Sequence, residues 1–299
     1  MPTHVETEIA DQPACWRRAA ELAAAPVVLA GLPEPGERVA VVGCGTSLFI
    51  ARSYAALREH AGQGESDAFA ASEMPAGRRY DRVLALTRSG TTTEVLELLG
   101  RLRGTTAITA VTADADTPVM EAADRVVVLD FADERSVVQT RFATTALALF
   151  RAHLGEDLAG AIADAERAVA GPLPDGVADR TQFTFLGTGW TVGLADEAAL
   201  KLREASLSWS ESYPAMEYRH GPIAVTGENS AVWMFGAAPP GLAAEVAATG
   251  GLWVRQELDP AASLIMAQRL AVARGLARGL DPDVPRHLSR SVILRSASV

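Results

Sequence analysis

Seven small polar or basic residues follow one another in a single turn between two apolar segments. Residues 86–99 read LTRSGTTTEVLELL, and the turn over 87–93 separates an apolar run (82–86) from an amphipathic run (94–99). The first run is typical of a buried strand, and the spacing of the second predicts a helix. A tight turn needs only one or two such residues. The excess of hydroxyl groups therefore indicates a further role.

A hydroxyl-rich turn between a strand and a helix can bind an anion. The start of a helix presents free N–H groups and the positive end of the helix dipole, and Thr87, Ser89 and Thr92 add hydroxyl donors. Thr46 and Ser47 occupy the equivalent turn after an earlier apolar run. Helix capping is the alternative, but one cap accounts for one hydroxyl group, so phosphate binding is favoured. Neither turn fits the P-loop or the dinucleotide motif, which disfavours ATP and dinucleotides.

A second group of candidate residues lies in the latter half of the chain. Lys201 and Glu204 share one face of a predicted helix, and an ordinary surface ion pair is the alternative. His220 precedes Gly-Pro outside any periodic segment, where an imidazole could move protons or simply be exposed. Cys44, beside a predicted helix start, is either an activated thiolate or a small packed residue.

Composition limits the class of protein. A net charge of −10 over 299 residues disfavours a nucleic-acid partner. Two cysteines, Cys15 and Cys44, are too few to cross-link a chain of this length and fit a reducing compartment. No apolar signal region or membrane-spanning run is visible, so we expect a cytoplasmic protein with no membrane partner. The five histidines lack metal-ligand spacing, and we expect neither a metal nor another cofactor.

Apolar runs alternate with helical patterns along the first half of the chain. This alternation indicates βαβ units and a doubly wound parallel sheet with helices on both faces. We expect two flavodoxin-like, three-layer αβα domains with mainly parallel sheets, residues 1–171 and 172–299, joined by a Pro/Gly-rich linker. The predicted strands of the first half are 38–42, 67–71, 82–86, 106–112 and 125–129, and long helices are predicted over 136–154 and 156–170.

The second half repeats features of the first. Residues 41–59 and 185–204 each combine a strand, a G-x-G turn and an Ala/Leu-rich helix that ends in Arg-Glu. Gly43 and Gly187 then correspond, at a difference of 144 in residue number. Any two strand–helix units share such a likeness, but duplication is favoured. Further strands are predicted over 230–235 and 252–254, with a closing helix over 261–278.

At these residues the chain resembles the sugar isomerase (SIS) domain family in its tandem form. The likeness is to the isomerase half of glucosamine-6-phosphate synthase and to relatives without the glutaminase half. The segments that carry it are GCGTS, LTRSGTTTE, ERSVVQTRFATT, EAALKLRE, ESYPAMEYRHGP and DPDVPRHLSRSV. The resemblance implies a homodimeric phosphosugar aldose–ketose isomerase or isomerising deaminase, acting on a hexose 6-phosphate or an amino-hexose 6-phosphate.

The resemblance also implies roles for individual residues. Glu204 corresponds to the base that moves a proton between C1 and C2, with Lys201 beside it. His220 corresponds to a histidine that helps to open the sugar ring and that comes, in relatives, from the second subunit. The residues implied to contact the sugar phosphate are Thr46, Ser47, Thr87, Arg88, Ser89, Thr92, Gln139, Ser289 and Arg290.

Four residues depart from the family pattern, and Thr87, where the family has serine, is a mild change. Arg88 replaces a glutamine and adds a positive charge that could bind phosphate directly. Gln139 replaces a small hydroxyl residue. Arg290 replaces a lysine that can form an imine with a keto-sugar, and arginine forms no Schiff base. Proton transfer by Glu204 is therefore the expected chemistry. A non-catalytic sugar-phosphate-binding regulatory module and a related deglycase or lyase stay open as alternatives.

Overall fold

Two parallel sheets organise the chain in a computed structural model that describes residues 2–294. All neighbouring strands within each sheet run parallel. The α/β class with parallel sheets is thus confirmed. The first sheet has the order β2-β1-β3-β4-β5, from β1 (Val39–Gly43), β2 (Ser66–Ala70), β3 (Arg82–Leu86), β4 (Ala107–Thr112) and β5 (Arg125–Val128). The second has the order β7-β6-β8-β9, from β6 (Gln182–Gly187), β7 (Ser210–Pro214), β8 (Ser230–Met234) and β9 (Leu252–Arg255).

Helices cover both faces of the first sheet. Val41 packs with the cluster that contains α4 and α7, whereas Val42, on the opposite face, packs with the cluster that contains α5 and α6. Within residues 2–294, no helix is both long enough and apolar enough to cross a membrane. The helices are α1 (His4–Ala10), α2 (Gln12–Leu22), α3 (Pro26–Leu29), α4 (Thr46–His60), α5 (Thr93–Leu102), α6 (Val119–Ala122), α7 (Arg141–His153), α8 (Ala159–Ala170), α9 (Thr191–Ser206), α10 (Leu242–Ala248) and α11 (Pro260–Ala277).

The first strand of each sheet along the chain, β1 or β6, leads into the same kind of turn. Gly45 after β1 and Gly189 after β6 both have a φ of 54°, a conformation that favours glycine. A Cβ atom on Gly43 would lie 2.7 Å from the backbone of Ser47, and one on Gly187 would lie 2.3 Å from Thr191 O. This correspondence agrees with the predicted repeat. The division into two domains after residue 171 stays a prediction.

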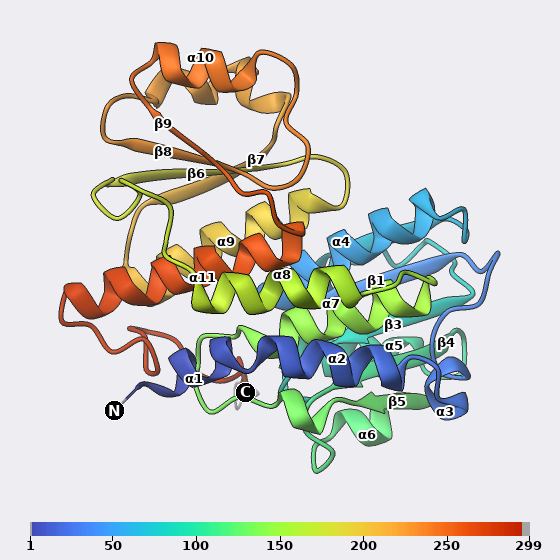
Figure 1. The fold of residues 1–299 in the computed structure, drawn as a ribbon. Helices are drawn as coiled ribbons and strands as arrows, with labels where there is room; N and C mark the ends of the chain where they lie inside the picture. The colour runs from blue at the N-terminus through green and yellow to red at the C-terminus, as the bar shows by residue number, and fades with distance from the viewer. Residues whose placement is uncertain (1, 295–299) are drawn as a thin grey trace, which may run out of the picture.

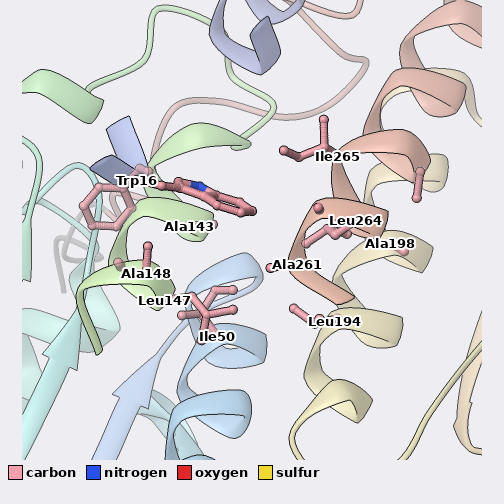
Figure 2. Packing of buried hydrophobic residues seen from close by; sticks show 14 of the residues in the cluster. Trp16, Ile50, Ala143, Leu147, Ala148, Leu194, Ala198, Ala261, Leu264 and Ile265 are labelled. Carbon is pink, nitrogen blue, oxygen red and sulfur yellow. The ribbon is translucent and has the colours of Figure 1, made fainter. Parts of the chain in front are cut away.

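One hydrophobic core runs from the first sheet to the second. Its cluster includes Val41 of β1 and Phe185 of β6. Figure 1 shows α4, α7, α8, α9 and α11 between the two sheets, and Figure 2 shows Ile50 of α4 and Leu194 of α9 in this core. The layer of helices between the sheets is therefore shared by both.

Helices α4 and α9 approach each other closely because residue 193 has no side chain. A Cβ atom on Gly193 would lie 2.3 Å from Phe49 O and 2.4 Å from Ser53 Oγ. Ser53 Oγ donates a hydrogen bond across the same contact to Trp190 O, at 2.9 Å. The spacing of the two helices is thus set at a backbone contact.

The helix predicted from residue 136 begins instead at Arg141, so that part of the prediction is wrong. The buried carboxylate of Glu134 accepts hydrogen bonds from the backbone N–H groups of Thr140 and Arg141, at 2.5 and 2.7 Å. These bonds satisfy N–H groups that the first turn of a helix leaves free. Ser136 is held by Glu8 from the amino-terminal helix. Residues 136–140 therefore form a loop between the first sheet and α7.

Candidate functional site

A cavity of about 270 Å³ lies at the carboxyl ends of β1 and β3. Ligands of open α/β sheets bind at this edge, and the volume lies just below the range of about 300–1,000 Å³ that is typical of small-molecule sites. Ten residues predicted from the sequence line the cavity together: Thr46, Ser47, Thr87, Arg88, Ser89, Thr92, Gln139, Glu204, Ser289 and Arg290. The sequence interpretation missed Ser291 and Val292, which also line it.

Hydroxyl groups from two turns face this cavity. Thr46 and Ser47 form the first turn of α4, and Thr92 precedes the first residue of α5. Thr87 Oγ1 is buried and has no hydrogen-bond partner among residues 2–294. Ser89 Oγ accepts a hydrogen bond from the backbone N–H of Thr91, at 3.3 Å. Two helix starts and several hydroxyl donors at one edge can bind an anion with little basic charge.

Lys201 connects α9 to the first of these turns. Its side chain is 1% exposed, and Nζ donates a hydrogen bond to Thr46 Oγ1 at 3.0 Å. Nζ also donates to the carboxylate of Glu204, which is 18% exposed and lines the cavity. The Lys201–Glu204 pair is therefore buried at the cavity and is not the surface ion pair that was the alternative.

A second carboxylate lies behind Lys201. Glu197 Oε1 is 3.4 Å from Lys201 Nζ, and Glu197 is fully buried. Burial raises the pKa of Glu197 to about 8, although the charge of Lys201 acts to lower it. Burial lowers the pKa of Lys201, but Glu197 and Glu204 outweigh this effect and raise it above its ordinary value. Lys201 therefore stays charged. The role of Glu197 was missed, although its spacing of four residues from Lys201 was a visible signal.

Arg88 and Arg290, the two arginines that depart from the family pattern, point toward the loop before α7. Arg88 is buried, and its guanidinium donates hydrogen bonds to Ser136 O at 3.1 Å and to Arg290 O at 2.8 Å. The Arg290 guanidinium pairs with Asp133 Oδ1 at 2.5 Å and donates a hydrogen bond to Glu134 O. Both side chains are therefore engaged by the protein itself.

Gln139 and Ser289 also line the cavity and keep free hydrogen-bonding capacity. Gln139 Oε1 is buried and has no partner in the part of the chain that the structure describes. Ser289 is exposed, and its hydroxyl donates a hydrogen bond to Ser291 O at 2.8 Å. A ligand with hydroxyl or amino donors could bind to the Gln139 amide oxygen.

His220 does not line the cavity within one chain. It ends the short helix η3 (Glu217–His220), which follows β7, and its side chain is exposed. Cys44 does line the cavity, but burial and the charge of Glu94 raise the pKa of its thiol. This direction disfavours an activated thiolate. Among residues 2–294, no three His, Cys, Asp or Glu side chains are grouped so that they could hold a metal ion.

No family model matches the chain, but individual proteins are similar to it. It is 35% identical over 144 residues to a glutamine–fructose-6-phosphate aminotransferase (isomerizing) of Neisseria meningitidis, covering 38% of this chain and 24% of the relative. An enzyme of the same name from Thermus thermophilus is 27% identical over 318 residues, covering 87% of this chain and 52% of the relative. The chain thus spans about half or less of the length of these curated relatives.

A solved structure shares the fold along nearly the whole chain. The glucosamine-6-phosphate deaminase of Thermotoga maritima superposes with a TM-score of 0.81 at 24% sequence identity, covering 98% of this chain and all of that one. This likeness shows the fold, and the sequence relatives agree with it. The likeness in sequence to these aminotransferases and the likeness in fold to this deaminase agree with the resemblance seen in the sequence motifs.

Proposed function

We propose that this protein is a phosphosugar isomerase or isomerising deaminase that acts on a hexose 6-phosphate or an amino-hexose 6-phosphate. The observation that carries the proposal is a single cavity lined both by the hydroxyl-rich turns and by the carboxylate of Glu204. The names of the sequence relatives, which join fructose 6-phosphate to isomerisation, point to the same substrate class.

The phosphoryl group would bind at the turns after β1 and β3. Ser47, Ser89 and Thr92 can donate hydroxyl hydrogen bonds to its oxygens, and the starts of α4 and α5 favour its negative charge. This binding would hold the sugar by one end. The reacting carbons would then extend toward α9.

Proton transfer would be carried out by Glu204. Its carboxylate would take the proton from C2 of the open-chain aldose, giving an enediolate with its charge on O1. It would then return that proton to C1, while the proton of the C2 hydroxyl group moves to O1 to give the ketose. A positioned base contributes about 10²–10⁴-fold to such a step. The ammonium of Lys201 is bonded to both Glu204 and Thr46, and it would hold the carboxylate in place beside the turn after β1. Because Arg290 forms no Schiff base, the route uses no imine with the protein.

We also propose a homodimer in which His220 of the partner subunit completes the site. The exposed position of His220 on η3, away from the cavity of its own chain, supports this arrangement. Tandem domains over 1–171 and 172–299 would then supply the phosphate turns and the base, respectively. The confinement of each sheet to one side of residue 171 supports that division.

Solvent exchange tests the proposal directly. The full chain is incubated in D₂O with fructose 6-phosphate or glucosamine 6-phosphate, and NMR follows deuterium at the C1 and C2 positions while an assay follows ammonia. Deuterium incorporation supports the isomerase, and incorporation with ammonia release supports the deaminase. Thermal stabilisation by the sugars without any exchange would contradict the proposal and favour a regulatory module. Cleavage of a sugar bond without isomerisation would instead favour a lyase or deglycase.

A further inference from the structure

Three segments that line the cavity meet at the side chain of Arg88. Nη1 donates hydrogen bonds to Ser136 O and Val137 O, at 3.1 and 3.4 Å, in the loop before α7. Nη2 donates to Arg290 O, at 2.8 Å, in the carboxyl-terminal segment. Arg88 itself belongs to the turn after β3. One guanidinium therefore joins stretches that lie 48 and 202 residues away along the chain.

The contacts of Arg88 and Arg290 form a closed ring. Arg88 Nη1 lies 3.5 Å from the buried carboxylate of Glu134, and the backbone carbonyl of Glu134 accepts a hydrogen bond from Arg290. Arg290 also pairs with Asp133 and accepts a hydrogen bond at its own backbone oxygen from Arg88. Arg88 thus fixes the segment that carries Arg290, and the Arg290 side chain fixes the segment of Asp133 and Glu134, which also contacts Arg88.

The carboxyl-terminal segment depends on these ties, because its other described hydrogen bonds to the chain are few. One, partly buried, joins the Thr91 and Ser291 hydroxyl groups at 2.8 Å, and the others lie near solvent. Thr93 N donates a hydrogen bond to Val292 O at 3.1 Å, and Leu294 N donates to Thr93 Oγ1 at 2.9 Å. Val292 and Leu294 expose 52% and 61% of their surface. Few buried apolar contacts and exposed backbone hydrogen bonds are typical of a segment that opens easily.

We propose that Arg88 and Arg290 form a clasp that holds residues 288–292 as a fixed wall of the cavity, so that Arg88 acts on the ligand through this wall and is not a direct phosphate ligand. Arg88 is then a positioning residue. The part of the inference that concerns the ligand rests on the proposed function, whereas the clasp itself does not.

A direct phosphate contact is the competing role. Arg88 Nε is buried and has no hydrogen-bond partner among residues 2–294, so one N–H is left for another acceptor. The two terminal nitrogens, however, are engaged by backbone oxygens and by Glu134. The two roles predict different affinities for inorganic phosphate, which is too small to reach residues 288–292. A direct contact of Arg88 would affect phosphate binding, whereas a positioning role would not.

Hydrogen exchange of the full chain tests the clasp. The variant R88Q/E134Q removes both buried charges together, so that neither is left unpaired, and a glutamine at 134 can still accept from the start of α7. We expect the amides of Thr93 and Leu294, which donate hydrogen bonds between this segment and the start of α5, to exchange at least about tenfold faster than in the unmodified protein. Unchanged exchange at these amides would overturn the clasp.

Two further variants make the result specific. R82Q/E37Q removes a partly buried ion pair of 2.9 Å at the other end of β3 and is expected to leave exchange of the carboxyl-terminal segment unaltered. R290Q removes the contacts of the Arg290 side chain with Asp133 and Glu134 but keeps the backbone oxygen that accepts from Arg88. It is expected to speed exchange of the same amides by a smaller factor than R88Q/E134Q. If R88Q/E134Q fails to fold, hydrogen exchange in R290Q alone still tests the clasp.

Calorimetric titration with inorganic phosphate and with fructose 6-phosphate separates the two roles of Arg88. For the clasp we expect R88Q/E134Q to bind inorganic phosphate within about twofold of the unmodified protein and fructose 6-phosphate at least about tenfold more weakly. An equal loss for both would overturn the positioning role and assign a direct contact. Failure of the unmodified protein to bind either would count against the proposed function, while the exchange experiment would still decide the clasp.

Discussion

The ammonium group of Lys201 donates a hydrogen bond to Thr46 Oγ1 at 3.0 Å, across 155 residues of sequence. Lys201 lies on α9, which follows a strand of the second sheet, and Thr46 begins α4, which follows a strand of the first. The same ammonium also pairs with Glu204. This contact links the turn proposed to bind phosphate to the carboxylate proposed to move a proton.

Replacing the proposed base by its amide is expected to stop chemistry and leave binding intact. Glutamine keeps the size of Glu204 but cannot accept a proton, so E204Q is expected to slow solvent exchange at C2 by about 10²–10⁴-fold. The dissociation constant for the sugar phosphate, measured by calorimetry, should change by no more than a few-fold. E245Q, at an exposed ion pair with Arg219, serves as the control. Normal isomerisation by E204Q would show that another residue is the base.

Removing two hydroxyl groups from the cavity is expected to weaken substrate binding. Hydrogen bonds to a charged group contribute about 1.5–3 kcal/mol each, so S89A/T92A is expected to raise KM at least tenfold with a small effect on kcat. Steady-state kinetics and thermal unfolding are measured together. T105A removes a hydroxyl that caps the exposed end of α5 and should leave KM unaltered. An unchanged KM in S89A/T92A would exclude the turn as the phosphate site.

The raised pKa of Glu197 predicts a pH dependence of stability. A carboxyl group in the unfolded chain has a pKa of about 4.3, whereas burial raises that of Glu197 to about 8. Between these values the folded state holds a proton that the unfolded state has released, so this contribution to the free energy of unfolding falls as pH rises. It is fully present below about pH 4.3 and is lost as pH rises through about 8.

The variant E197Q is therefore expected to lose less stability between pH 5 and 8 than the unmodified protein. Urea unfolding at several pH values measures the difference. E166Q, at an exposed ion pair with Arg17, should keep the slope of the unmodified protein. Parallel curves for E197Q and the unmodified protein would show that Glu197 is already ionised in the folded state at pH 5.

Mixing two inactive variants tests the contribution of His220 across an interface. If each site combines Glu204 of one chain with His220 of the other, heterodimers of E204Q and H220N contain one intact site and one doubly altered site. Random reassembly of equal amounts should then recover about a quarter of the unmodified activity. The activity of the mixture is compared with that of each variant alone. No recovery, in a mixture shown to contain heterodimers, would contradict a shared site.

The sequence predicted those parts of the fold that depend on local pattern. All seven strands predicted with residue bounds lie within one residue of the observed strands, for example 82–86 and β3, because the strands of a covered parallel sheet read as apolar runs. The edge strand β7 was missed because SESYP is polar and ends in proline. The predicted start of the helix over 136–154 was wrong, because two carboxylates keep the residues before α7 out of the helix. Glu8 accepts hydrogen bonds from Arg135 and Ser136, and Glu134 accepts them from the backbone of Thr140 and Arg141.

In the candidate site, too, features with a local cause could be predicted and features with distant partners could not. Hydroxyl and glycine residues could be assigned to turns because their chemistry is local, and these turns do line one cavity. The directions of the Arg88 and Arg290 side chains could not be predicted, because their partners lie in loops that only the folded chain brings together. The position of His220 outside the cavity likewise depends on the path of the chain after β7.

The missing side chain at Gly193 makes the distance between α4 and α9 a fixed length. Because backbone contacts backbone there, the distance between the proposed phosphate site at the start of α4 and Glu204 on α9 would stay constant. That distance would set how many carbons can separate the phosphorus from the reacting centre. Under the proposed function, this spacing would favour sugar phosphates of one chain length over others.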